Sequence, residues 1–304
     1  MMRRLARPAL VLMGLLALLF LAAAVGFRLL DQTNGSLVSS GQERTYLLYV
    51  PDSYDPATPT SLVITIHGFA QWPAHQMQLS RWNALADQHG FIVVYPSGTG
   101  FPRRWRAGGV SAAGDDPQVD VRFVSDLIAH LESKYNIAPD RIYVNGLSNG
   151  GGMSFLLACA LSERIAAVGM VAGAYVLPWE ECNPARPVPA IVFHGTDDPI
   201  VPFDGGPSRP FGSPFPNVPE WVETLARRNG CNGPPRELSI SDEVTGRQFT
   251  DCEADVVFYV IAGGGHTWPG GIALPELIAN RTTYDIDATQ TMWEFFQEHP
   301  LPGR

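Results

Sequence analysis

Positive charge is scarce in this chain of 304 residues. Lysine and arginine together number 21, against 30 aspartates and glutamates, so the net charge is −9. Four of the arginines lie within residues 1–30, which leaves 17 basic and 30 acidic residues in the rest of the chain. A protein body this acidic repels phosphate backbones, and it contains no basic stripe. The composition therefore argues against a nucleic-acid partner.

Cysteine is also rare, and none lies near the N-terminus, which excludes lipid attachment there. The chain has no C-x-x-C spacing and no Cys/His cluster, so no metal site is predicted. The four cysteines, an even number, are typical of disulfides in an oxidising compartment. Three pairings are possible. We favour Cys231–Cys252, which would pin a Pro/Gly-rich insertion, together with Cys159–Cys182.

Charged residues are absent from Ala9 to Phe27, an apolar run that follows three arginines. Its length lies between the core of a signal peptide and a spanning helix of about 20 residues. We therefore interpret residues 1–30 as a signal peptide or an uncleaved N-terminal membrane anchor. Residues 31–42 then form a polar linker, and residues 43–304 form a single catalytic domain. The protein is expected to be exported, either secreted or periplasmic, with residues 9–27 as its anchor if the segment is kept.

No internal repeat is present, and nothing indicates a second domain. Strand-like and helix-like segments alternate along the body. The predicted strands are 43–50, 61–66, 91–95, 141–145, 166–172, 190–193 and 255–261, with a hairpin at 236–252. The predicted helices are 75–88, 119–135, one beginning at 153, 220–229 and 288–297. Such alternation predicts an α/β fold, a doubly wound and mostly parallel sheet with helices on both faces. Ligands then bind beyond the carboxyl ends of the strands.

Residues 146–150 read Gly-Leu-Ser-Asn-Gly and lie between the strand at 141–145 and an apolar helix. Strand, G-x-S-x-G and helix in this order form the context of a nucleophile elbow. The two glycines lack the Cβ atoms that would collide in so sharp a turn. We therefore predict that Ser148 is a nucleophile.

A serine hydroxyl needs a general base, and that base needs a partner that fixes its tautomer. His266 follows a predicted strand among glycines and is the predicted base. The acid should follow the preceding strand, where Asp197 and Asp198 both lie. We favour Asp198, and Asp197 is the alternative. The order Ser148, Asp198, His266 is the order that α/β-hydrolases use.

The oxyanion of the tetrahedral intermediate needs two N–H donors. We predict the backbone amides of Asn149, directly after the nucleophile, and of Phe69, in the loop after an early strand. Trp72, Trp105 and Trp268 are predicted to bind substrate. Core packing is the alternative for Trp72 and Trp105, whereas Trp268 lies only two residues from the predicted base.

Several blocks together resemble one known family. They are His67-Gly68-Phe69, Tyr95-Pro96, residues 146–151, Val171-Ala172-Gly173, His194-Gly195-Thr196 with residues 198–202, and residues 263–270. The chain is similar over roughly residues 44–298 to the polyhydroxybutyrate depolymerase and feruloyl esterase family of α/β-hydrolases. The resemblance implies a secreted serine esterase without metal or organic cofactor. One departure is Phe69, where the family often has cysteine, and it could reshape the acyl pocket.

No polymer-binding domain is appended, so the expected substrates are soluble esters. These are hydroxyalkanoate oligomers or feruloyl- and acetyl-type esters of sugars. Two other functions remain open on the sequence. One is a serine peptidase of the same fold, although no propeller or large cap is present to select peptides. The other is a catalytically silent, membrane-tethered binding module, although the three predicted catalytic residues are all present.

Overall fold

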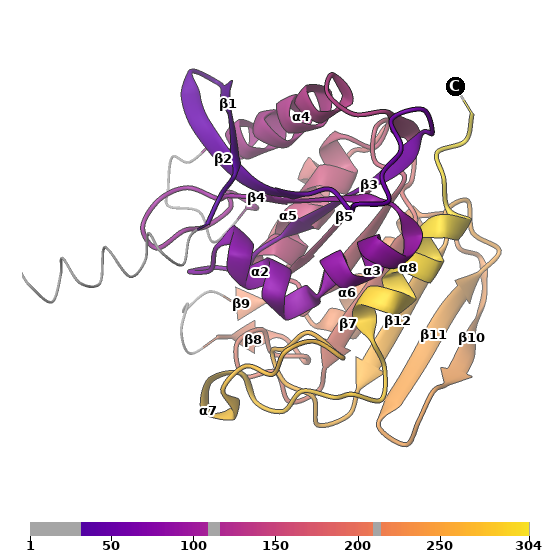
Figure 1. Ribbon diagram of the computed structural model, residues 1–304. Coiled ribbons are helices and arrows are strands. Elements are labelled where there is room, and N and C mark those ends of the chain that lie inside the picture. The colour runs from indigo at the N-terminus through magenta and orange to yellow at the C-terminus, as the bar shows by residue number, and fades with distance from the viewer. Residues whose placement is uncertain (1–31, 109–115, 209–213, 304) are drawn as a thin grey trace, which may run out of the picture. The chain divides into compact units, whose positions relative to one another are not determined.

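A computed structural model describes residues 32–108, 116–208 and 214–303 (Figure 1). The strands are β1 (Gly35–Ser39), β2 (Gln42–Tyr49), β3 (Thr60–Ile66), β4 (Ile92–Pro96), β5 (Ile137–Leu147), β6 (Ala167–Val171), β7 (Ala190–Gly195), β8 (Gly206–Pro207), β9 (Pro214–Phe215), β10 (Gly233–Ser239), β11 (Val244–Thr250) and β12 (Val256–Ile261). The helices are α2 (Pro73–Ser80), α3 (Trp82–His89), α4 (Gln118–Glu132), α5 (Asn149–Ala160), the 3₁₀ helix η2 (Trp179–Glu181), α6 (Val218–Arg228), α7 (Glu276–Ala279) and α8 (Ala288–Glu298).

A ten-stranded sheet organises the described residues, in the order β1-β2-β4-β3-β5-β6-β7-β12-β11-β10. The strands from β4 to β12 in this order pair in parallel, and the strands outside them pair antiparallel. The inner strands β4, β6 and β7 are buried at every residue. Strands of this kind need a helical layer on each face. The predicted α/β fold class, a mostly parallel sheet covered by helices, is confirmed.

Two apolar cores fill the spaces between the sheet and its helices. One core contains side chains of α4, α5 and α6, and the other contains side chains of α2, α3 and α8. In Figure 1, α2, α3 and α8 lie in front of the sheet. Side-chain caps fix where two of these helices begin. Asn217 accepts a hydrogen bond from the Glu220 amide at the start of α6, and Asp287 accepts from two amides at the start of α8.

The helix predicted at 75–88 is two helices, α2 and α3, that meet at Arg81. Arg81 has a φ of 60°, in the left-handed region, and its amide closes α2 onto Met77 O. The break turns α3 so that the buried Trp82 indole donates to Asn145 Oδ1 at 3.1 Å. An arginine gives no sequence signal for a left-handed residue, so a continuous helix was predicted.

The segment predicted as a linker, residues 31–42, contains a strand. β1 pairs antiparallel with β2, and Gly35 lies opposite Tyr46. A Cβ on Gly35 would come within 2.3 Å of the Tyr46 ring, so only glycine leaves room for that ring against the β1 backbone. The predicted signal peptide or anchor, residues 1–30, lies outside the described residues. None of the helices within the described residues has the length and apolar character needed to cross a membrane.

Both favoured disulfides are confirmed. Cys159–Cys182 links the end of α5 to the segment after η2, and Cys231–Cys252 links the end of α6 to the chain after β11. The second bond therefore closes the predicted insertion, which forms the β10–β11 hairpin. Disulfides of this kind stabilise a fold chiefly by restricting the unfolded chain.

Candidate active site

Ser148 lies on a strained turn between β5 and α5. Its φ is 59° and its ψ is −120°, a conformation that costs free energy for any residue with a Cβ. The turn is held by hydrogen bonds from Ser148 N to Val171 O and from Ala174 N to Ser148 O, both of 2.9 Å. A Cβ on Gly150 would lie 2.2 Å from Ile66 O, so only glycine fits there. The sequence G-x-S-x-G therefore produces the sharp elbow that was predicted from it.

His266 and Asp198 meet where two neighbouring parallel strands end. Asp198 follows β7 and His266 follows β12, and these strands pair along their whole length. His266 Nδ1 lies 2.8 Å from Asp198 Oδ2. The amides of Ile200 and Val201 both donate to the other oxygen, Asp198 Oδ1, at 2.8 Å. The carboxylate is therefore fixed on both of its oxygens.

The protein interior around Asp198 sets its charge. Burial alone would raise the pKa of Asp198. Three interactions outweigh burial and lower the pKa: the charge and hydrogen bond of His266, the nearby His194, and the Val201 amide. His194 Nε2 lies 3.4 Å from Asp198 Oδ2. Asp197, by contrast, is exposed and accepts a hydrogen bond from the Thr196 hydroxyl. The structure thus places Asp198, and not Asp197, against His266.

Ser148 and His266 line one cavity of about 230 Å³. Its other walls include Phe69, which comes from the predicted oxyanion loop, and Ile200. The rest are Gly68, Gln71, Leu274, Pro275, Ile278 and Ala279. The wall formed by residues 274–279 was missed in the sequence. The sequence feature that could have indicated this wall is the group of apolar residues that follows His266. In the structure, Leu277 of this group is fully exposed and Ile278 is 64% exposed.

A buried network ties the two predicted oxyanion loops together. The Asn149 side chain accepts from Trp105 N at 2.7 Å and donates to Trp105 O at 3.1 Å. The Trp105 indole donates to His67 O at 3.0 Å. His67 Nδ1 lies 2.8 Å from Gly68 O, and His67 Nε2 accepts from an amide at 3.0 Å. Burial lowers the pKa of His67 to about 3, so this ring is neutral and acts as a structural hydrogen-bonding group.

The three predicted substrate-binding tryptophans are placed differently from the prediction. Trp105 and Trp268 are completely buried, and neither lines the cavity at Ser148. Trp105 stacks on Phe123, and the Trp268 indole donates to Thr289 Oγ1 at 2.9 Å. Core packing therefore describes these two residues. Trp72 is half-buried beside His75 and is also outside the cavity lining. The substrate-binding role predicted for Trp105 and Trp268 is therefore replaced by core packing, and the role predicted for Trp72 stays a prediction.

No three His, Cys, Asp or Glu side chains come together as a metal site would require within residues 32–108, 116–208 and 214–303. The described site offers the chemistry of a serine and an imidazole that line one cavity, with a carboxylate hydrogen-bonded to the imidazole.

Comparison with known proteins places this chain among esterases. The model of the family Esterase PHB depolymerase matches residues 44–202. NocK of Nocardia uniformis subsp. tsuyamanensis is 31% identical over 264 residues, which are 79% of this chain and 74% of that protein. Feruloyl esterase C of Emericella nidulans is 28% identical over 277 residues, with 87% of each chain covered.

Solved structures show the same fold. An acetyl xylan esterase from Aspergillus awamori superimposes with a TM-score of 0.63 at 17% sequence identity. The match covers 84% of this chain and 94% of that one, and it shows the α/β-hydrolase fold. The family match, the relatives and the fold agree with one another. The chain therefore belongs to the Esterase PHB depolymerase family and is a carboxylic ester hydrolase.

Proposed function

We propose that this enzyme cleaves carboxylic esters through an acyl-serine intermediate on Ser148. The observation that carries the proposal is the 2.8 Å contact between His266 Nδ1 and Asp198 Oδ2, because His266 shares a cavity with the strained Ser148. Asp198 holds His266 with a proton on Nδ1, which leaves Nε2 free of a proton and able to accept one. A serine beside such an imidazole becomes a competent nucleophile.

The reaction then runs in two halves. Ser148 Oγ attacks the ester carbonyl while His266 takes its proton, and the same proton passes to the alcohol as the tetrahedral intermediate collapses. Water repeats the sequence on the acyl-serine and releases the acid. The oxyanion is held by the amides of Phe69 and Asn149. The Asn149 amide belongs to the first turn of α5, where N–H groups have no partner within the helix.

The proposed substrates are soluble esters with a small or aromatic acyl group. A cavity of about 230 Å³ with walls from Phe69, Ile200 and Leu274 suits an apolar acyl group of modest size. The relatives named for feruloyl and acetyl xylan ester cleavage support feruloyl- and acetyl-type esters of sugars, and the family name supports hydroxyalkanoate oligomers. The two disulfides support action after export, in an oxidising compartment.

A panel of substrates tests the proposal on the full chain. It contains p-nitrophenyl acetate, methyl ferulate, a hydroxybutyrate dimer and a peptide p-nitroanilide. We expect turnover of the esters and no turnover of the anilide. Ser148→Ala should reduce ester turnover roughly 10³-fold or more. The matched control is Ser154→Ala, on the same helix but buried away from the cavity, which should remain active. Ester turnover that survives Ser148→Ala would contradict the assignment, and preferred cleavage of the anilide would favour a peptidase.

A further inference from the structure

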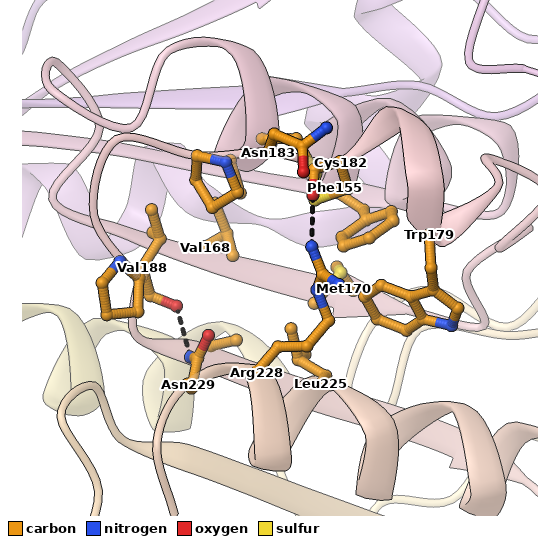
Figure 2. A pocket seen from close by; sticks show the side chains of 15 residues that line it. Phe155, Val168, Met170, Trp179, Cys182, Asn183, Val188, Leu225, Arg228 and Asn229 are labelled. Atoms are coloured by element: carbon orange, nitrogen blue, oxygen red, sulfur yellow. Dashed lines mark hydrogen bonds between the residues drawn. A yellow bond between two sulfur atoms is a disulfide. The ribbon is translucent and has the colours of Figure 1, made fainter.

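A second cavity, larger than the one at Ser148, lies between α5, β6, η2 and α6 (Figure 2). Its volume is about 390 Å³, within the range of sites for small organic molecules. Apolar side chains form most of its wall, among them Phe155, Val168, Met170, Val188 and Leu225. The disulfide Cys159–Cys182 forms another part of the wall. The cavity is therefore an apolar space with one covalently fixed side.

This cavity is separate from the candidate active site. The two sets of lining residues have no member in common. Cys159 lies 11 positions after Ser148 along α5, which corresponds to roughly 16 Å of helix. The buried rings of Tyr175 and Trp221 stack at 3.6 Å, and Phe155 packs edge-on against Trp221. Phe155 thus belongs to a packed aromatic cluster at the wall of this cavity.

One cation lies at the edge of this apolar space. The Arg228 guanidinium lies 5.4 Å from the centre of the Trp179 ring and donates through Nη2 to Cys182 O at 2.5 Å (Figure 2). Among the described residues, no carboxylate lies within 4.0 Å of this guanidinium, whereas Arg164, Arg247 and Arg281 each form ion pairs. A hydrogen bond to one carbonyl uses a single donor of five. The Arg228 side chain is exposed, and within the part of the chain that the structure describes its charge has no anionic partner.

The polar groups around the cation are already fixed. The Asn229 side chain donates to Val188 O at 2.9 Å, and the Asn183 side chain donates to Glu180 O at 2.9 Å. Arg228 is also held in place by Trp179 and Cys182 O. A planar guanidinium that is held in position matches a carboxylate with two parallel hydrogen bonds. The adjoining apolar walls match a hydrophobic body attached to that carboxylate.

We propose that this cavity binds a small amphipathic monocarboxylate. The carboxylate pairs with Arg228, and an aromatic or aliphatic body packs against Phe155, Met170 and Leu225. The inference goes beyond ester hydrolysis and does not depend on Ser148. Carboxylic acids are also what an ester hydrolase releases, so acids formed by this enzyme belong to the class that the cavity fits. The site is thus a place where acid product binds apart from the catalytic serine.

The test measures binding of 3-phenylpropanoate to the full chain by isothermal titration calorimetry, with the uncharged 3-phenylpropanamide as the comparison ligand. We expect the acid to bind and the amide to bind at least about tenfold more weakly, because the amide lacks the charge that Arg228 pairs with. Ser148→Ala should leave this binding unchanged, which separates the result from the fate of the proposed catalytic mechanism.

Two arginines at the end of α6 provide a matched pair of variants. Arg228→Gln should weaken acid binding about tenfold or more, whereas Arg227→Gln removes the same charge from a neighbour that does not line the cavity and should have no effect. Ala158→Leu places a larger side chain into the cavity wall and should also abolish binding. Unfolding temperatures of all variants show whether the fold is kept, and Arg228→Lys, which keeps the charge, should retain part of the affinity. Equal binding of acid and amide, no binding of either, or binding insensitive to both Arg228→Gln and Ala158→Leu would overturn the proposal.

Discussion

At the scale of single residues, the Asp198 carboxylate is the most constrained group of the site. Two amides hold one of its oxygens, and His266 holds the other. Its pKa lies below the ordinary 3.8 because His266, His194 and the Val201 amide outweigh the effect of burial. A carboxylate with a lowered pKa stabilises the fold above its unfolded pKa, and that contribution is lost as the pH falls through the folded value. Asp198 is therefore ionised at neutral pH.

Replacing the Asp198 carboxylate should leave the His266 side chain in place but remove its ability to act as a general base. Asp198→Asn offers a hydrogen-bond donor where His266 Nδ1–H needs an acceptor, so the imidazole would turn its proton toward Ser148. We expect kcat for ester hydrolysis to fall on the order of 10⁴-fold. Asp197→Asn changes the same group at the exposed neighbour and should leave kcat within about twofold. A larger loss from Asp197→Asn than from Asp198→Asn would reverse the assignment of the acid.

At the scale of elements, the connection between β4 and α4 reaches across to the elbow. Trp105 in this connection is clamped by the Asn149 side chain through both its amide and its carbonyl. The same tryptophan supports His67 O, at the start of the loop that carries Phe69. Three separate segments are thus fixed relative to one another around the proposed oxyanion site. The network explains why Trp105 is buried and does not line the cavity.

Breaking this clamp should displace an oxyanion donor while leaving the backbone amide in place. Asn149→Ala leaves the buried amide and carbonyl of Trp105 without their partners, which costs about 1–3 kcal/mol per group. We expect kcat to fall roughly 10- to 100-fold with a smaller change in KM, since misplacement of the donor acts on the transition state. Ser154→Ala removes one buried hydrogen bond from the same helix and is the control for stability alone. Equal kcat values for the two variants would show that the clamp has no part in catalysis.

At the scale of the whole molecule, buried histidines make the fold sensitive to acid. Burial lowers the pKa values of His67, His75 and His194, and that of His67 reaches about 3. Each takes up a proton more readily in the unfolded chain, whose histidines titrate near 6.5. For His67, the unfolded state binds more protons than the folded state at any pH between about 3 and 6.5. The free energy of unfolding therefore falls as the pH falls through this range.

The expected slope can be measured by urea unfolding at several pH values. His67 alone should lower the free energy of unfolding by about 3 kcal/mol between pH 7 and pH 4.5. His67→Gln should therefore flatten the dependence on pH, even though it lowers stability at neutral pH by breaking buried hydrogen bonds. His89→Gln, at an exposed position, should keep the dependence of the parent protein. A parent protein whose stability is constant over this range would contradict a neutral, buried His67.

Local signals made much of the fold and the candidate site predictable. These signals are the glycines around Ser148, the apolar strands, and the polar residues at strand ends. Each determines structure through neighbours that lie only a few positions away in the sequence. Residues that depend on distant packing were harder to place. Burial of Trp105 and Trp268 depends on Asn149 and Thr289, and the cavity wall near Ile278 depends on how a long loop folds back. The turn at Arg81 and the pairing of β1 with β2 likewise arise from tertiary contacts.

The most direct test of the central claim is covalent labelling of the full chain with a fluorophosphonate, mapped by mass spectrometry. An activated serine attacks this reagent and keeps the phosphonyl group, whereas an ordinary serine hydroxyl does not react. We predict one adduct, on Ser148, that is absent from Ser148→Ala and strongly slowed in Asp198→Asn. A folded protein that hydrolyses esters but carries no adduct, or carries it on another serine, would contradict the account.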